Sequence, residues 1–156
     1  MNMKLLIISL LLGISCSLDL STETYGCGYC QPEQVHISFG EKLNDIVVTW
    51  STFDNTNMSL VHYGEHVMDQ ETSGFRKLFV DGGKLKRSQY IHTVTLKDLK
   101  FNTSYVYNVG SKYGWSNEFS FTTVPEGEDW PVRAAIYGDM GNTNAQSVSY
   151  LQDEAE

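Results

Sequence analysis

The sequence predicts an all-β sandwich, and three observations lead to this prediction. Between residues 33 and 123 the chain is divided into short segments rich in Val, Ile, Thr, Tyr and Phe, separated by clusters of Gly, Asn and Asp. No segment of this region shows the 3.6-residue apolar period of an amphipathic helix. The length of 156 residues, of which 41% are hydrophobic and 19% charged, fits one packed domain. The seven expected strands are residues 34–39, 46–51, 59–63, 76–80, 89–96, 104–109 and 117–123.

The apolar residues of these segments alternate, so one face of each strand is expected to turn inward. Burial of one aliphatic or aromatic side chain contributes roughly 1.5–3 kcal/mol. About a dozen such side chains offset much of the ordering entropy of a small sandwich, without a metal or cofactor. We expect Trp50 to be a structural core residue. The whole expected core is Val35, Ile37, Phe39, Ile46, Val48, Trp50, Val94, Leu96, Tyr105, Tyr107, Val109, Phe119 and Phe121.

The type of sandwich is indicated by the turn before the sixth expected strand. Leu99 lies six residues before Tyr105, across a turn that contains Asn102. This is the spacing of a tyrosine corner, in which the phenol hydroxyl bonds to the backbone a few residues upstream. The alternative for Tyr105 is an ordinary core tyrosine. No pair of cysteines spans two strands, which excludes an antibody-type domain and leaves a fibronectin type III-like seven-stranded sandwich over residues 33–124.

Residues 1–17 have the pattern of a signal peptide: Lys4, an apolar run over residues 5–14, and then small residues. The run is shorter than the about 20 residues that a membrane-spanning helix requires. A buried N-terminal helix is the alternative, but no polar face interrupts the run. We therefore expect entry into the secretory pathway, an extracellular or lysosomal location and no membrane partner, with residues 18–32 as an N-terminal segment.

In the secretory pathway cysteines can form disulfides and asparagines can be glycosylated. Cys27 and Cys30 have no second cysteine pair to complete a zinc site, and a redox site would need a βαβ context that is absent here. We expect either a local disulfide or pairing with a cysteine outside this sequence. Asn57 and Asn102 begin Asn-x-Ser/Thr sequons in polar, turn-like surroundings, so both are candidate glycosylation sites.

Charge excludes one large class of partner. The chain has 11 Lys and Arg against 19 Asp and Glu, a net charge of -8. Such an excess of negative charge does not favour binding to the phosphate backbone of a nucleic acid.

Residues 81–84, Asp-Gly-Gly-Lys, lack the spacing of a phosphate-binding loop and predict a hairpin turn. Lys84, Lys86 and Arg87 are expected to form a solvated loop.

A second unit is predicted after the sandwich. Residues 125–131 are bounded by prolines and have the composition of an inter-domain linker. A strand of the buried type follows, then Gly-Asp-Met-Gly at residues 138–141 and a helix from about Asn144. An acid at the carboxyl end of a buried strand, beside glycines, lies where open α/β sheets bind metals and phosphates. Asp139 is therefore a candidate metal ligand, and an Asx-turn or cap residue is the alternative.

Blocks of sequence in a fixed order resemble the N-terminal domain of the purple acid phosphatases. Residues 135–141 resemble the opening of that family's metallophosphoesterase domain, so residues 132–156 read as its truncated first β-α unit. The resemblance covers nearly all of residues 31–156. The blocks are residues 31–38, 45–52, 61–64, 90–96, 105–110, 115–116 and 119–123.

The resemblance implies a phosphatase that hydrolyses phosphate monoesters. In that family Fe³⁺ and a second divalent metal, Fe, Zn or Mn, activate a bound hydroxide, and Asp139 matches a ligand of the ferric ion. The family's other ligand motifs follow that aspartate, and none occurs in these 156 residues.

We therefore expect the N-terminal fragment of a secreted acid phosphatase that has no catalytic residues of its own and binds no metal stably. The alternative is a non-catalytic fibronectin-type binding or structural module. None of the four histidines is spaced to complete a site with Asp139, and each is expected to be a solvated or partly buried strand residue. They are His36, His62, His66 and His92.

Overall fold

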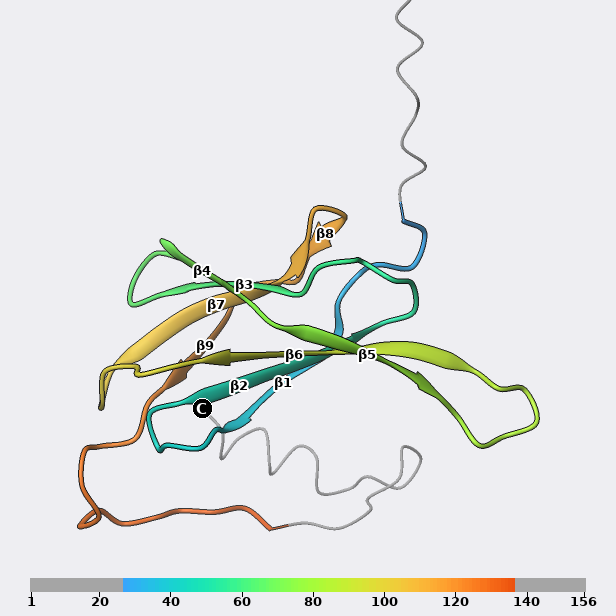
Figure 1. The fold of residues 1–156 in the computed structure, drawn as a ribbon. Coiled ribbons are helices and arrows are strands. Elements are labelled where there is room, and N and C mark those ends of the chain that lie inside the picture. Colours follow the sequence, from blue (N-terminus) through green and yellow to red (C-terminus); the bar gives the residue numbers. More distant parts are fainter. Residues whose placement is uncertain (1–26, 137–156) are drawn as a thin grey trace, which may run out of the picture.

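The computed structural model describes residues 27–136, which form two antiparallel sheets packed face to face (Figure 1). One sheet has four strands in the order β1-β2-β6-β5. The other has five, in the order β4-β3-β7-β8, and β9 pairs with β7 on the same edge as β8. The strands are β1 (Glu33–Phe39), β2 (Ile46–Thr52), β3 (Leu60–Gly64), β4 (Gln70–Ser73), β5 (Phe75–Val80), β6 (Ser88–Leu96), β7 (Ser104–Ser111), β8 (Gly114–Trp115) and β9 (Phe119–Thr122).

The predicted all-β sandwich is confirmed, and each of the seven expected strands is present. Two further strands, β4 and β8, were not predicted. β4 has the sequence Gln-Glu-Thr-Ser, which has no apolar alternation, and β8 is only two residues long. Within the described part of the chain there is no helix that could span a membrane. The signal-peptide residues and the expected β-α unit from residue 137 onward, including Asp139, lie outside the described residues.

Most of the expected core is buried between the two sheets. Trp50, Val48, Val94 and Leu96 are each at most 1% exposed. These four side chains come from β2 and β6 of one sheet, and they face Val61 and Val109 of the other sheet, which are fully buried as well. Burial of such apolar side chains stabilises the fold. The buried cluster is Ile46, Val48, Trp50, Val61, Val94, Leu96, Leu99, Tyr105, Tyr107 and Val109, with Val35, Tyr63 and Phe121 partly buried against it.

Three residues assigned to the core are exposed, so that part of the prediction is wrong. Ile37 and Phe39 are 38% and 58% exposed, and Phe119 is 38% exposed. Ile37 pairs with the buried Val48, so its side chain does point to the inner face. However, β1 is an edge strand, and no described residue of the opposite sheet covers its margin. Alternation predicted the direction of these side chains correctly, but it could not predict whether they are covered.

The chain passes from one sheet to the other at Gly74, the single residue between β4 and β5. Its amide donates to the Ser59 carbonyl at 3.1 Å. A Cβ at this position would collide with the carbonyl oxygen of Thr93 in β6. The crossing therefore needs glycine, because the backbone of residue 74 lies directly against the neighbouring strand.

Candidate functional site

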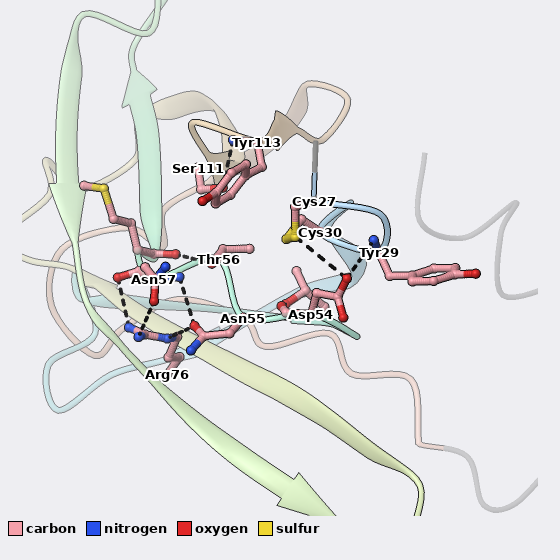
Figure 2. The surroundings of a disulfide bond; sticks show 12 residues. Cys27, Tyr29, Cys30, Asp54, Asn55, Thr56, Asn57, Arg76, Ser111 and Tyr113 are labelled. Carbon is pink, nitrogen blue, oxygen red and sulfur yellow. Dashed lines mark hydrogen bonds between the residues drawn. A yellow bond between two sulfur atoms is a disulfide. The ribbon is translucent and has the colours of Figure 1, made fainter. Parts of the chain in front are cut away.

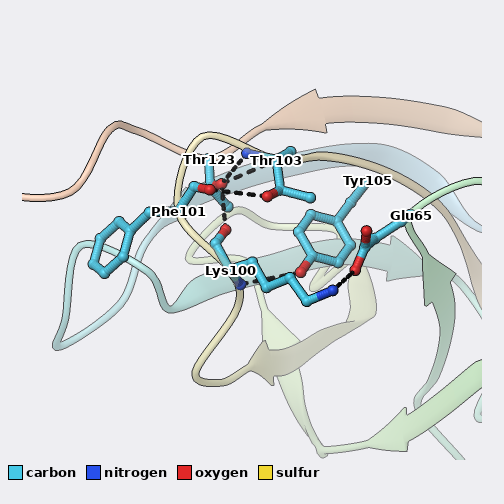
Figure 3. Close-up of polar contacts among 6 residues, drawn as sticks. All are labelled: Glu65, Lys100, Phe101, Thr103, Tyr105 and Thr123. Atoms are coloured by element: carbon cyan, nitrogen blue, oxygen red, sulfur yellow. Dashed lines mark hydrogen bonds and ion pairs between the residues drawn. The ribbon is translucent and has the colours of Figure 1, made fainter.

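A closely connected polar site, a tyrosine corner, lies at the end of the sandwich (Figure 3). The Tyr105 hydroxyl accepts a hydrogen bond from the Lys100 amide at 3.1 Å. The Thr123 hydroxyl donates to the Lys100 carbonyl at 2.6 Å, and it accepts from the Thr103 amide at 3.0 Å. Tyr105 and Thr123 are both buried. The geometry is that of a tyrosine corner, with its last anchor at the final residue of the sandwich.

The chain leaves the sandwich at this corner. The Thr123 amide donates to the Thr103 carbonyl and the Asn102 amide to the Val124 carbonyl, both at 3.0 Å. Beyond Val124 the described chain contains no strand, and Val132 and Ile136 are 72% and 95% exposed. The side chains of Val132 and Ile136 are therefore largely open to solvent within the described residues.

No metal centre forms within residues 27–136. No group of three or more His, Cys, Asp or Glu side chains converges there. His36 is exposed and its Nδ1 lies 2.8 Å from the Gln34 carbonyl, while His66 is exposed in the turn after β3. His62 stacks on Trp115 with ring centroids 3.8 Å apart, and its Nε2 lies 2.8 Å from the Glu71 carboxylate. The four histidines are thus separate, and this part of the chain does not fit a binuclear metal site.

His92 differs from the expectation of a solvated or partly buried residue, because it is fully buried. Its Nδ1 lies 2.8 Å from the Ser59 hydroxyl and its Nε2 2.9 Å from the Thr52 hydroxyl. The Thr52 hydroxyl donates its proton to the Asp54 carbonyl at 2.7 Å. It must therefore accept from Nε2–H, which leaves Nδ1 to accept from Ser59.

These bonds hold His92 as a neutral imidazole between the two sheets. Burial, and to a smaller extent the charge of Arg76, lower the pKa of His92 to about 4. The sequence signal for this burial was the position of residue 92, which is in phase with the core residues Val94 and Leu96. It was missed because a histidine alone does not reveal which polar partners will satisfy it.

A disulfide joins Cys27 and Cys30 within the N-terminal segment (Figure 2). Of the two expected alternatives, the local disulfide is therefore the one that forms. The Tyr29 amide donates to the Asp54 carboxylate at 3.1 Å. In return, the amides of Phe53 and Asp54 donate to the Tyr29 carbonyl at 3.1 and 3.0 Å. Cys30 is 2% exposed. The disulfide loop therefore packs on the end of β2.

Both sequon asparagines are exposed and have left-handed backbone conformations. Asn57 has a φ of 60° and Asn102 a φ of 48°, which asparagine tolerates better than most residues. The Arg76 guanidinium donates to the Asn57 carbonyl at 3.0 Å and to its Oδ1 at 3.5 Å (Figure 2). No hydrogen bond of the Asn102 side chain is found among the described residues.

The strand order and the tyrosine corner define a fibronectin type III-like sandwich. Residues 32–123 match the family model described as "Purple acid Phosphatase, N-terminal domain". The chain belongs to the purple acid phosphatase family.

Relatives and a solved structure agree with this assignment. Acid phosphatase type 7 of Danio rerio is 42% identical over 81% of this chain and 29% of its own length. The purple acid phosphatase of Glycine max is 34% identical over 83% of this chain and 28% of its own length. The structure of purple acid phosphatase PPD1 from yellow lupin has a TM-score of 0.54 and 25% identity, covering 74% of this chain and 23% of that one. The chain thus spans less than a third of the relatives it matches.

Proposed function

We propose that this chain is the N-terminal part of a secreted acid phosphatase that hydrolyses phosphate monoesters. In this proposal residues 33–124 are the accessory sandwich, residues 125–131 are the linker, and residues 132–156 begin the metallophosphoesterase domain. The observation that carries it is the match of residues 32–123 to the purple acid phosphatase N-terminal domain. Relatives of which this chain covers 28–29% bear the name acid phosphatase.

The metal chemistry is assigned to the part of such a protein that follows the sandwich. Fe³⁺ with Fe, Zn or Mn as the second metal would activate water for attack on phosphorus. Asp139 is the residue of this chain that we propose as a ligand, because a carboxylate is a hard oxygen donor. The described residues offer no converging donors, and in this proposal the sandwich is an accessory domain.

Export is supported by two features of the described residues. A disulfide such as that between Cys27 and Cys30 persists in oxidising compartments. The exposed sequons at Asn57 and Asn102 are proposed to carry N-linked glycans. Expression in a secreting eukaryotic cell line tests this: Asn57→Gln and Asn102→Gln should each raise the electrophoretic mobility by the loss of one glycan. A protein whose mobility no glycosidase changes would contradict the proposed glycans.

The test of the phosphatase proposal uses two lengths of protein. A gene product that continues into the region corresponding to the rest of the relatives should hydrolyse an aryl phosphate in a metal-dependent way, and Asp139→Asn should abolish most of that activity. Glu128→Gln, in the linker, is the matched control and should have no effect. The 156-residue chain alone should show no activity. Metal-dependent hydrolysis by the chain alone would contradict this assignment and would place the active site within these residues.

A non-catalytic binding or structural module is the second candidate. It is favoured by the self-contained hydrophobic core within residues 33–124. The same experiment separates the two candidates, because a module of this kind would leave Asp139→Asn without consequence in any length of the protein.

A further inference from the structure

The hairpin of β5 and β6 differs in charge from the rest of the molecule. Residues 75–90 contain five basic side chains and one acidic side chain, a net charge of +4, although the whole chain has a net charge of -8. The hairpin extends beyond the rest of the sandwich (Figure 1, yellow-green). A strand of six residues spans about 20 Å. The positive charge is therefore concentrated on a projection from an acidic protein.

The same hairpin exposes apolar side chains on both of its faces. Along β5, Phe75 and Phe79 lie on one face and Leu78 and Val80 on the other, and each of the four is about half exposed or more. Leu85, in the connecting loop, is 80% exposed. Large apolar side chains gathered in this way mark an interaction site more often than a solvated surface.

The loop at the tip has a defined conformation that is organised by Asp81. The Asp81 amide donates to the Arg87 carbonyl at 2.8 Å. Its carboxylate accepts from the Gly83 amide and from the Arg87 guanidinium, both at 3.0 Å. These bonds close the base of the loop and leave Lys84, Leu85 and Lys86 exposed at its apex. The surface is therefore formed before any partner arrives, which lowers the ordering cost of binding.

Three of the five basic side chains are available to a partner. Arg87 is paired with Asp81, and Arg76 is bonded to Asn55 and Asn57. In the part of the chain that the structure describes, no ion pair engages Lys77, Lys84 or Lys86. Two of these lysines flank Leu85 directly.

We propose that the β5–β6 hairpin, residues 75–90, docks on the surface of an anionic phospholipid bilayer. Lys77, Lys84 and Lys86 contact the acidic headgroups, and Leu85 and Phe79 enter the boundary between headgroups and acyl chains. The contact proposed here is that of an exposed loop with the bilayer surface. This replaces the expectation that Lys84, Lys86 and Arg87 form a merely solvated loop, and that no membrane takes part.

Other partners fit the hairpin less well. A nucleic acid or acidic polysaccharide would match the lysines but would offer no apolar surface to Leu85 and Phe79. A second copy that extended the sheet along the β5 edge would bring Lys77 of each copy close to its equivalent, which is unfavourable. A protein partner covers one face of a hairpin, whereas a bilayer surrounds a tip that is apolar on both faces.

The attachment point of the rest of the protein lies at the end of β6 away from the tip. The chain leaves the sandwich at Val124, which is bonded to the turn that follows the last residue of β6, Leu96. The hairpin loop lies beyond Ser88, the first residue of β6. These two points are at opposite ends of a nine-residue strand, about 30 Å apart.

Co-sedimentation with vesicles tests the proposal on the 156-residue chain. Vesicles of phosphatidylcholine with one third phosphatidylserine should retain the protein, and pure phosphatidylcholine vesicles should retain at least tenfold less. Each basic side chain near an anionic surface strengthens partitioning about fivefold, so Lys77→Glu combined with Lys84→Glu should weaken binding by more than about 25-fold. Lys97→Glu, an exposed lysine beyond the other end of β6, is the matched control and should have little effect.

The apolar part of the contact needs a separate readout. Leu85→Trp should give a blue-shifted emission when anionic vesicles are added, whereas Val67→Trp, at a similarly exposed position in the turn between β3 and β4, should not. Equal binding to neutral and anionic vesicles, or no blue shift at residue 85, would overturn the proposal. So would binding by this chain that is lost in a longer form containing the catalytic domain, because the occupant of the hairpin would then be that domain.

Discussion

The imidazole of His92 lies parallel to the indole of Trp50, with ring centroids 4.9 Å apart and an angle of 6° between the planes. The two residues are paired across β2 and β6. Both rings are buried, and the hydroxyls of Ser59 and Thr52 bond to the two imidazole nitrogens. The stack and its two hydroxyl partners thus join the first sheet to the residue that precedes β3.

Stability should fall in acid because of His92. Its pKa is about 4 in the folded protein and about 6.5 in an unfolded chain. The unfolded state therefore binds more protons between these values, so stability is complete above about pH 6.5 and decreases as the pH falls towards about 4. The loss is on the order of 3 kcal/mol. Urea unfolding across this range measures it.

The control for this pH effect is a variant that lacks the buried imidazole. His92→Gln should be less stable at neutral pH but should show a flatter profile between about pH 4 and 6.5. His62→Gln, at a partly exposed position, should retain the profile of the parent. If His92→Gln and the parent had parallel profiles, another group would be responsible for the acid sensitivity.

Tyr105→Phe tests the tyrosine corner. The variant removes the acceptor of the Lys100 amide and leaves that amide without its partner at a partly buried position. A loss of about 1–2 kcal/mol in the free energy of unfolding is expected. Tyr113→Phe removes a hydroxyl from an exposed residue and should change the free energy very little. Equal effects of the two variants would show that the hydroxyl of Tyr105 contributes nothing specific.

Gly74→Ala tests the crossing between the sheets. The new methyl group would meet the carbonyl oxygen of Thr93, which belongs to the β6 backbone and cannot move as a side chain would. We expect a loss of about 3 kcal/mol or more, measured by thermal or urea unfolding. Gly82→Ala is the matched control, because a Cβ there has no heavy atom within 4 Å. A stable Gly74→Ala protein would mean that β4 can leave the sheet at little cost.

Reduction of the disulfide between Cys27 and Cys30 should destabilise the domain modestly. The loop is short, so the entropic contribution is about 2 kcal/mol. Unfolding with and without dithiothreitol measures the difference. A variant with serine at both positions should be insensitive to the reductant. If dithiothreitol destabilised that variant equally, the effect would not come from this bond.

The sequence predicted the strands well where one face is continuously apolar and covered. Ile46, Val48 and Trp50 alternate with polar residues, and β2 lies between two other strands, so pattern and burial coincide. β1 shows the limit of this reasoning, because the alternation of Ile37 and Phe39 carries no information about the opposite sheet. A β-bulge adds to the difficulty: Glu33 pairs with Ser51 but His36 with Thr49, so two residues of β1 lie opposite Trp50 alone.

The polar interior was less predictable than the strands. His92 depends on Ser59 and Thr52, which are 33 and 40 residues away in the sequence. Such a pairing arises only when the sheets are packed, so no local pattern contains it. The tyrosine corner was predictable from residues 99–105 because its hydrogen bond joins positions only five residues apart. The disulfide was one of two open alternatives, and only the fold decides between them.

The anchoring of Thr123 has a consequence for everything attached after it. A buried hydroxyl that bonds at once to the backbone of residues 100 and 103 clamps the final residue of the sandwich. The chain that follows Thr123 therefore starts from a residue whose position and direction are fixed by these hydrogen bonds. In the proposed longer protein, the freedom of orientation of the following domain would therefore lie in residues 124–131, after this fixed point.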